Sequence, residues 1–352
     1  MTATIDRCAS ADIAEVAAFF RIAFPFNPRL QEQDYLDWQF RDTPFRDSDD
    51  YNIFVLHRDG AIRGVMAYVP VMLRLGQREV VACWTANWHA PGQGVHGLRL
   101  LAEVNRVSDF RLHVGLTERS LTIYRRMSMP CLESMDRWLL PLNLEAVLDI
   151  AGVAGGADAA RLAESSQHAQ PGDGGAVEHL DELPADRQIA FDHWPDLDCG
   201  VSRRTDFVNW RYVQIPRHHY KILRGDEEQF AVIRFETIAG RNFGICRLLE
   251  WTCHGAIGRA VLGEIIRLCR LERAILLDFY STARSLAQEL RALGFLSESE
   301  LAKPIPRLFR PLGPGWPLRL AVDLPPHRHA RSLDFGRWYV TLGDSDLDRV
   351  KL

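Results

Sequence analysis

The chain has 352 residues, of which 47% are hydrophobic and 25% charged, and its formal net charge is −4. This length favours two domains over one, and the composition is typical of a globular protein. Either half of the chain is long enough to bury a core of its own. The slightly acidic balance argues against a protein that holds nucleic acid by charge.

Cysteine and histidine spacing indicates whether a metal site or disulfides are expected. The N-terminal sequence indicates whether the protein is exported. The seven cysteines form no C-x-x-C pair and the twelve histidines include no H-E-x-x-H pattern, so neither a disulfide framework nor a metal site is expected. No basic region followed by an apolar run opens the sequence, and no apolar stretch approaches the length of about 18 residues that crosses a membrane. We therefore expect a cytoplasmic protein without membrane insertion.

The first half predicts a helix, three strands, a helix, a strand and a helix. A helix is expected from Ile13 to Phe20, because Ser10 and Asp12 precede an apolar-periodic run. Three strands follow, separated by Asp-Gly and Gly-Gln turns that are typical of hairpins. They cover residues 51–56, 62–73 and 79–88; a glycine-bearing turn at 92–97, a helix with its apolar face at 98–104, a strand at 110–116 and a helix at 120–127 come next.

The second half repeats this order of elements. Strands are predicted at 220–223, 230–235 and 243–253, followed by a helix with its apolar face at 261–268, a strand at 274–280 and a helix at 284–293. Between them lie turns with glycine, as in the first half. The repeated order predicts that the chain is a tandem duplication of one unit.

An aromatic-x-x-Trp-x-aromatic block occurs once in each half and gives the spacing of the repeat. Trp210 follows Trp38 by 172 positions, and Pro216 follows Pro44 by the same 172. The closing helices align with Leu293 opposite Met127, 166 positions apart, as a few loop deletions would produce. We expect Trp38 and Trp210 each to anchor a helix to its own sheet.

Two segments interrupt the globular pattern. Residues 151–184 are rich in Ala, Gly, Ser, Asp and Gln, which predicts a linker or mobile loop. Residues 303–326 contain seven prolines and can form edge strands and turns but hardly a helix. We predict an N-terminal module over 1–145, a linker over 146–190 and a C-terminal module over 191–352.

Several short motifs resemble those of the GNAT superfamily of N-acyltransferases. The stretch from Thr4 to Ile13 is similar to the opening of a GNAT domain, and 91–98 lies where that family has its pyrophosphate loop. The closing helix carries Tyr124, and the second half supplies a Gly294–Phe295 pair. The resemblance implies an α/β (α+β) fold with two tandem GNAT-like modules, each a mixed, mainly antiparallel twisted sheet flanked by helices.

Two further blocks are similar to a bacterial subgroup of such proteins found around polysaccharide genes. They are the stretch from Phe207 to Tyr212 with Pro216, and the terminal stretch from Trp338 to Asp346. No assigned activity transfers with that subgroup.

The resemblance implies an acyl-coenzyme A, such as acetyl-CoA, held at a glycine-rich turn of the first module. Backbone N–H groups at a helix N-terminus bind anions, and glycines let the backbone approach a pyrophosphate. The predicted cofactor-binding residues are Ala86, Asn87 and Trp88 in the preceding strand and Gly92, Gln93, Gly94, Val95, His96 and Gly97 in the turn. The corresponding turn at 253–259 shows no clear fingerprint. An ordinary glycine turn is the alternative for 92–97.

Tyr124 is the predicted general acid. In the GNAT family a tyrosine at this position protonates the departing coenzyme A thiolate, and a phenol has a proton to give because its reference pKa of about 10 keeps it protonated at neutral pH. Its counterpart in the second half is Leu290, which carries no proton to give. Chemistry is therefore expected in the first module. The alternative is that Tyr124 is an amphipathic core residue.

The general base is predicted along the strand before the glycine turn. Strand alternation places Glu79, Asn87 and His89 on one face, and His89, nearest the turn, titrates near neutrality. His89 is thus the first choice, and Glu118, just past the next strand, is the second. A structural role for His89 remains the alternative.

The function implied by the resemblance is an acyl-CoA-dependent N-acyltransferase. It would move an acetyl or other acyl group to an amine of a small molecule or sugar, with no metal and no nucleic acid partner, and the oligomeric state stays open. One alternative is an aminoacyl-tRNA-dependent transferase of the tandem type that builds peptidoglycan bridges. The other is a catalytically inactive GNAT-like ligand-binding protein.

Overall fold

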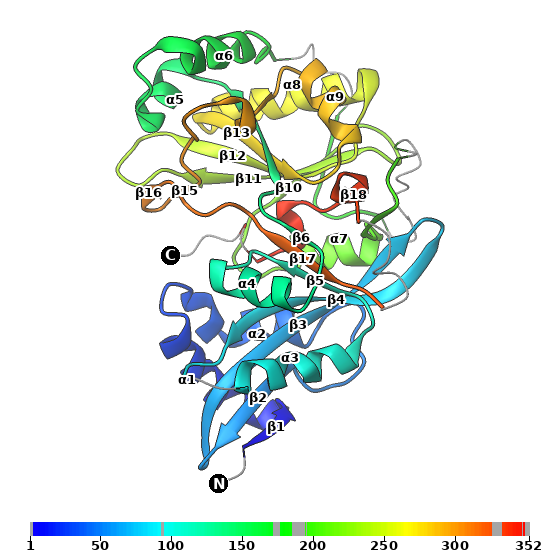
Figure 1. Cartoon of the computed structure of the whole chain (residues 1–352). Helices are drawn as coiled ribbons and strands as arrows, with labels where there is room; N and C mark the ends of the chain where they lie inside the picture. The colour runs from blue at the N-terminus through cyan, green and yellow to red at the C-terminus, as the bar shows by residue number, and fades with distance from the viewer. Residues whose placement is uncertain are drawn as a thin grey trace.

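The computed structural model describes residues 3–92, 95–171, 177–184, 194, 196–325, 333–346 and 348. The described residues form two large sheets, stacked one above the other in Figure 1, with the N-terminal half of the chain below. The first sheet has the order β1-β2-β3-β4-β5-β17-β6, with β9 on β3 and β18 on β9, and the second has the order β14-β7-β13-β12-β11-β10-β8.

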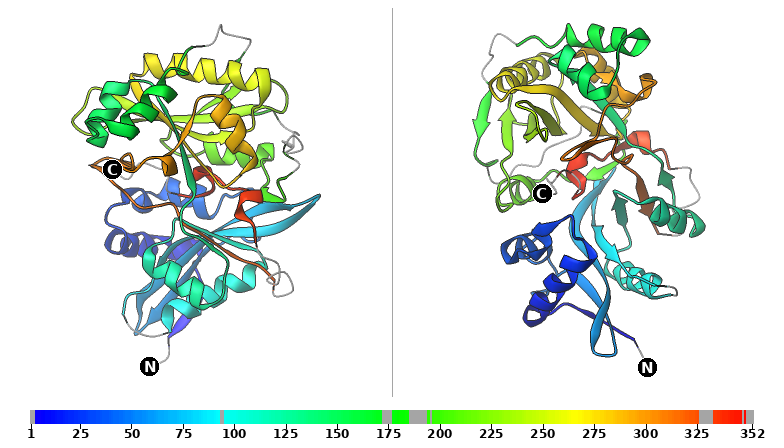
Figure 2. Two further views of the ribbon diagram at one scale, coloured as in Figure 1. Left: turned by 45° about the horizontal axis from the view of Figure 1, so that its top comes forward. Right: turned by 90° about the vertical axis from the view of Figure 1, so that its left-hand side faces the viewer.

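The elements of the first module follow the predicted order. They are β1 (Thr4–Arg7), η1 (Ser10–Asp12), α1 (Ile13–Ala23), η2 (Pro28–Gln31), α2 (Gln33–Phe40), β2 (Ile53–Arg58), β3 (Ala61–Leu75), β4 (Arg78–His89), α3 (His96–Val107), β5 (Arg111–Val114), α4 (Glu118–Arg126) and β6 (Cys131–Leu132). Helices α1 and α2 cover one face of the sheet, and α3 and α4 cover the other (Figure 2, right). Each is held by an apolar stripe, such as Leu100, Leu101 and Val104 of α3.

The second module repeats the arrangement and adds two helices before it. Its elements are β7 (Asp136–Pro141), α5 (Leu144–Ala151), α6 (Gly156–Ser166), β8 (Glu178–Leu180), β9 (Cys199–Val201), α7 (Thr205–Tyr212), β10 (Lys221–Arg224), β11 (Phe230–Thr237), β12 (Gly244–Trp251), α8 (Gly255–Leu271), β13 (Ala274–Ser281), α9 (Ser285–Ala292), β14 (Leu296–Ser297) and η3 (Glu298–Glu300). After these come β15 (Leu308–Phe309), β16 (Leu312–Gly313), β17 (Leu320–Asp323), η5 (Phe335–Arg337), β18 (Trp338–Tyr339) and η6 (Leu342–Asp344).

The predicted fold class is confirmed. Both large sheets are mixed and mainly antiparallel, with parallel pairing between β4 and β5 in the first and between β12 and β13 in the second. The closing helices end alike: Ser128 and Gly294 both have positive φ, and the next residue's N–H returns to the carbonyl of Tyr124 (3.0 Å) or Leu290 (2.9 Å). The two helix ends therefore match residue for residue.

The two modules exchange a strand. β7, which follows β6 in sequence, lies in the second sheet between β13 and β14, and β17 lies in the first sheet between β5 and β6. A buried Arg–Asp pair holds each exchanged strand: Arg111 bonds Asp323 of β17, and Arg137 of β7 bonds Asp278 at 2.8 Å. Each sheet is thus completed by the other half of the chain.

Trp38 of α2 and Trp210 of α7 stack against each other, with ring centroids 5.0 Å apart. Each indole N–H donates to the other tryptophan's backbone carbonyl, at 2.7 Å from Trp38 and 2.9 Å from Trp210. The prediction that each anchors a helix to its own sheet was therefore incomplete. The pair joins the modules, and its reciprocal bonds are those of two copies related by a local two-fold axis.

The segment predicted as a linker contains helix α6. Alanine is the best helix former, and the helix buries Leu162 completely. Asp158 accepts hydrogen bonds from the backbone N–H groups of Ala302 (3.0 Å) and Lys303 (2.9 Å), and Ser165 donates to the Gly294 carbonyl (2.6 Å). Tertiary contacts thus order a sequence whose composition indicated a loop. The predicted linker residues 172–176 and 185–190 lie outside the described residues.

Candidate functional site

Strands β4 and β5 are paired over a short stretch only. The pairs are Cys83 with Arg111 and Trp84 with Leu112. Beyond Ala86, which pairs with Ala67 of β3, the strand bulges: Asn87 has φ 49°, and the next pair is His89 with Val65. A bulge bends a strand and leaves its extra residue out of the ladder. The carboxyl ends of β4 and β5 therefore separate.

A polar cluster of Thr85, His113 and Tyr124 lies where the two strands separate. His113 Nδ1 lies 2.7 Å from Thr85 Oγ1 and 3.0 Å from Tyr124 Oη, and the imidazole stacks on the phenol ring at 4.2 Å. The exposed fraction is 0% for His113 and 1% for Tyr124. Strand β4, strand β5 and helix α4 each supply one side chain. Tyr124 was predicted from the sequence, whereas Thr85 and His113 were not.

Burial sets the protonation states of this cluster. It raises the pKa of Tyr124 well above the usual range, and a hydrogen bond from Thr85 lowers that pKa in part, so the phenol keeps its proton. Burial, with a smaller contribution from Arg111, lowers the pKa of His113 to about 3. The imidazole is therefore neutral at physiological pH. The cluster offers a neutral acid beside a neutral histidine.

Helix α3 begins beside this cluster. Its N-cap is Val95, and among the described residues no side chain caps its first amides. His96 and Gly97 lie in the first helical turn, and Gly92 has φ 97°. Gln93 and Gly94 lie outside the described residues.

Gly97 lets Trp88 pack on the first turn of α3. A Cβ at position 97 would meet the Trp88 indole at 3.3 Å. The same indole lies 5.9 Å from the Tyr124 ring, between centroids. Trp88 thus connects the start of α3 with the polar cluster.

Three buried polar atoms around the separated strands lack a partner within the part of the chain that the structure describes. They are Asn87 Oδ1, His96 Nδ1 and His113 Nε2. Buried polar atoms are nearly always hydrogen-bonded, and such exceptions call for an explanation. Unpartnered buried atoms also occur elsewhere in the described residues, such as Gln39 Oε1 and Trp251 Nε1, so these three do not by themselves mark a ligand site.

His89 faces away from Tyr124. It packs edge-on against Phe19 and Phe24 of the α1 side, at 5.9 and 5.6 Å between ring centroids, whereas Trp88 packs on the α3 side. The prediction that Glu79, Asn87 and His89 share a face was wrong, because the bulge at Asn87 shifts the alternation. Burial lowers the pKa of His89, which favours the neutral imidazole.

The other two acidic candidates lie away from the cluster. Glu79 sits near the start of β4, about 30 Å along the strand from His89, and accepts a 2.5 Å hydrogen bond from Ser202. Glu118 is exposed and pairs with Arg319 at 2.6 Å. The structure thus brings together Tyr124, Trp88, Asn87 and the start of α3, and leaves these two carboxylates outside.

The equivalent region of the second module is occupied by the chain itself. Beyond the last β12–β13 pair, Leu248 with Phe279, the tail from 338 to 341 bonds both strands. The Trp251 N–H donates to Tyr339 Oη (3.0 Å), and the Thr282 N–H donates to the Val340 carbonyl (3.1 Å). This part of the tail lies at the strand ends where the first module has its polar cluster.

A carboxylate also occupies the start of α8, the counterpart of α3. Glu289 of α9 accepts a hydrogen bond from the Gly255 N–H at 3.0 Å. A helix N-terminus attracts anions, and here a side chain takes that place. Counting back from the aligned ends of the closing helices, the first-module counterpart of Glu289 is the apolar Ile123.

The polar cluster itself has an apolar counterpart. With Tyr124 aligned to Leu290, and the strand pair Cys83–Arg111 aligned to Cys246–Leu277, Thr85 corresponds to Leu248 and His113 to Phe279. All three counterparts, Leu248, Phe279 and Leu290, belong to one apolar core. The fold therefore does not require polar groups at these positions.

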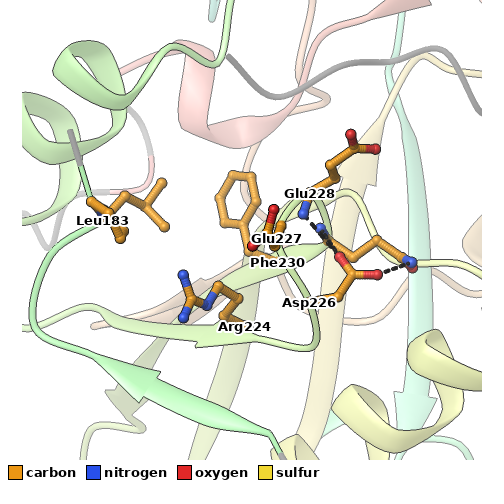
Figure 3. A pocket seen from close by; sticks show the side chains of 8 residues that line it. Leu183, Arg224, Asp226, Glu227, Glu228 and Phe230 are labelled. Atoms are coloured by element: carbon orange, nitrogen blue, oxygen red, sulfur yellow. Dashed lines mark hydrogen bonds between the residues drawn. The ribbon is translucent and has the colours of Figure 1, made fainter. Parts of the chain in front are cut away.

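A separate small pocket lies in the second module, at the turn between β10 and β11 (Figure 3). It is lined by Leu183, Arg224, Phe230 and the acidic turn at 226–228, and Asp226 accepts from the Gln229 backbone N–H at 2.7 Å. These bonds are those of an ordinary capped turn. The pocket contains none of the predicted site residues.

Within the described ranges, no helix is long and apolar enough to cross a membrane. The same residues contain no group of three or more His, Cys, Asp or Glu side chains placed to hold a metal ion.

No protein-family model and no curated protein matches this sequence. Solved structures do match it. A GCN5-related N-acetyltransferase from Anabaena variabilis aligns with 91% of this chain and 72% of its own, at 11% identity and TM-score 0.53. Saccharomyces cerevisiae N-myristoyltransferase with bound myristoyl-CoA aligns with 91% of this chain and 82% of its own, at 12% identity and TM-score 0.50.

Eis1 from Mycobacterium abscessus aligns with 79% of this chain, at 14% identity and TM-score 0.46, and this chain spans 65% of its length. The likeness to the first two structures shows that this protein has the GNAT N-acyltransferase fold, in a form with two such modules.

Proposed function

We propose that the first module binds an acyl-coenzyme A and transfers the acyl group to an amine. The observation that carries the proposal is the position of Tyr124: a buried, neutral phenol lies where β4 and β5 separate, beside the start of α3, whose first amides no described side chain caps. An acid and an anion-binding helix terminus are the two parts that a thioester of coenzyme A needs.

Residues at the start of α3 would hold the coenzyme A diphosphate. The backbone N–H groups of His96 and Gly97 lie in the first helical turn, where such groups have no intrahelical acceptor. The residues present therefore fit this substrate.

The transfer would proceed by direct attack of the amine on the thioester carbonyl. The bulge at Asn87 leaves a backbone N–H group outside the hydrogen-bond ladder between β3 and β4. This N–H group would stabilise the developing oxyanion. As the C–S bond breaks, Tyr124 would give its proton to the sulfur. His89 would take the proton of the attacking amine, and Glu118, already paired with Arg319, is poorly placed for that role.

The two faces of β4 would serve the two substrates. Tyr124 and Trp88 lie on the side of α3 and α4, and His89 lies on the side of α1. Coenzyme A would therefore occupy the first side and the amine the second, with the reaction at the bulge. The second module, filled by its own tail, would form a wall of the acceptor site. A small-molecule or sugar amine is the acceptor class we propose.

The first test is whether the protein binds coenzyme A. Thermal unfolding and titration calorimetry measure this binding. A ligand present at a hundred times its Kd stabilises the folded state by about 2.7 kcal/mol, so acetyl-CoA or a longer acyl-CoA should raise Tm clearly. No shift with any of several acyl-CoA species at millimolar concentration would refute the proposal and leave a ligand-binding role of another kind.

Variants of two matched glycines test which module binds coenzyme A. Gly97 packs on Trp88, and Gly258 of α8 packs on Trp251, with added Cβ atoms meeting these rings at 3.3 and 3.5 Å. Gly97→Val should weaken coenzyme A binding, because its side chain fills the start of α3. Gly258→Val should change stability alone. Equal effects of the two variants on binding would contradict a first-module site.

A further inference from the structure

The hydrogen bonds around Tyr124 have a direction. His113 is neutral and buried, so its ring carries one N–H, on Nδ1 or on Nε2. A proton on Nε2 would be a buried donor without a partner among the described residues. A proton on Nδ1 has an acceptor at 2.7 Å, Thr85 Oγ1. Buried N–H groups without acceptors are rarer than acceptors left unsatisfied, which favours Nδ1–H.

The direction continues through Thr85. Thr85 Oγ1 and Tyr124 Oη lie 2.7 and 3.0 Å from the same His113 Nδ1. Because the Thr85 oxygen accepts from His113, the Thr85 proton is available to the Tyr124 oxygen, and Thr85 lowers the pKa of the phenol, as a donor to that oxygen does. The Tyr124 oxygen then accepts within the cluster and its own proton is used by no group there. The order of donation runs from His113 to Thr85 to Tyr124.

We infer that Thr85 and His113 are positioning residues, which orient the Tyr124 hydroxyl toward its substrate and stabilise the phenolate that remains. The inference deepens the proposed function and rests on it. When Tyr124 gives its proton to the sulfur of the departing thiolate, the C–S bond breaks and a phenolate forms. Thr85, donating to that oxygen, stabilises it, and solvent returns the proton once coenzyme A leaves.

Comparison with the second module supports a functional role for the polar cluster. The counterparts of Thr85, His113 and Tyr124 are Leu248, Phe279 and Leu290, all buried in one core. The same strands and closing helix therefore pack well with three apolar side chains. A buried polar cluster kept in one copy only is not explained by packing, because burying polar groups is less favourable than burying apolar ones of similar size.

The tautomer of His113 can be measured without any substrate. Nitrogen-15 NMR of the imidazole in the intact protein should show Nδ1–H and a neutral ring at pH 5. Thr85→Val removes the acceptor, so Nδ1 should then accept from the Tyr124 hydroxyl at 3.0 Å and the proton should move to Nε2. Thr122→Val, an exposed hydroxyl on α4 that bonds Glu118, is the control and should change nothing. The Nε2–H tautomer in the unsubstituted protein would overturn the inference.

Kinetics give a second readout. His113→Phe keeps the stacked ring and removes both nitrogens, so kcat should fall about tenfold at unchanged KM for acyl-CoA. His113→Asn, with an amide nitrogen near the place of Nδ1, should recover most of the loss. In a Tyr124→Phe background, His113→Phe should have no further effect; additive losses would contradict the chain.

The two failures are distinguishable. Absence of acyl-CoA binding overturns the proposed function whatever the tautomer is. Binding and transfer with an Nε2–H ring, or with additive losses in the double variant of Tyr124→Phe and His113→Phe, overturn the positioning chain and leave the proposed function intact.

Discussion

The two modules share a framework and differ in what fills it. In each, a bulged strand pairs briefly with its parallel neighbour and leads to a helix whose first turn packs on a tryptophan. In the first module the separated strands hold Thr85, His113 and Tyr124. In the second they hold apolar side chains and the C-terminal tail, and Glu289 caps the helix.

The two modules therefore share a backbone geometry and differ in the side-chain chemistry placed on it. Bulge, strand order and closing turn depend on packing that both copies need, so both keep them. In the first module Tyr124 lies beside the start of α3, whose first amides no described side chain caps. In the second module Glu289 and the tail occupy the corresponding places.

The largest expected effect is on kcat, when the Tyr124 hydroxyl of the first module is removed, because the second module has Leu290 at the corresponding position. Tyr124→Phe should lower kcat about 10²- to 10⁴-fold, the usual contribution of a general acid. Binding of acyl-CoA, measured by calorimetry, should change little, because the ring and its packing remain. Leu290→Tyr is the reciprocal variant and should add no activity. Undiminished transfer by Tyr124→Phe would remove the proposed acid.

The contact that relates the modules is the next target. Trp38→Ala and Trp210→Ala should each lower the free energy of unfolding by about 3–5 kcal/mol, because each removes a buried ring and leaves the other tryptophan's backbone carbonyl without its indole donor. Since the two side chains touch, the double variant should cost less than the sum of the single ones. Urea unfolding measures all three, and strict additivity would speak against the reciprocal pair.

A single carboxylate at position 123 should cap the start of α3, as Glu289 caps the start of α8. Ile123→Glu places an acid where the second module has Glu289, so the side chain should occupy the α3 terminus and repel the diphosphate, weakening acyl-CoA binding about 10- to 100-fold. Ile123→Gln, neutral and of similar size, should weaken it much less. Calorimetry should give one site per chain, also in Glu289→Gln, because the tail still fills the second module. Two sites would contradict this comparison.

The smallest effect concerns pH. The pKa of His113 is about 3 in the folded protein and near 6.5 when exposed, so between these values the unfolded state binds more protons. Stability therefore rises with pH across this window and is lost as pH falls, by about 2 kcal/mol at about pH 5 from this residue. Denaturant titrations at pH 7 and pH 5 measure this loss. Between these pH values, the free energy of unfolding of His113→Asn should fall by about 2 kcal/mol less than that of the unsubstituted protein. The exposed His219→Asn serves as the control, and equal pH dependence of all three proteins would refute a buried neutral His113.

The sequence by itself determined the order of elements, the duplication and the inequality of the two halves. Local periodicity places strands and helices, because a chain segment of ten residues already decides which face is apolar. The spacing of Trp38 and Trp210 identified the repeat, and Tyr124 against Leu290 identified the module that can supply an acid. These inferences compare residues along the chain and need no knowledge of contacts.

Only the tertiary structure decided how the halves are joined and which residues surround Tyr124. The exchange of β7 and β17 pairs segments far apart in sequence, and no local pattern encodes such partners. One bulge residue, Asn87, moved His89 to the other face of β4. His113 had a signal, since it is a polar residue inside an apolar strand, but its role depends on Thr85 and Tyr124 meeting it, which only strand pairing and helix packing bring about.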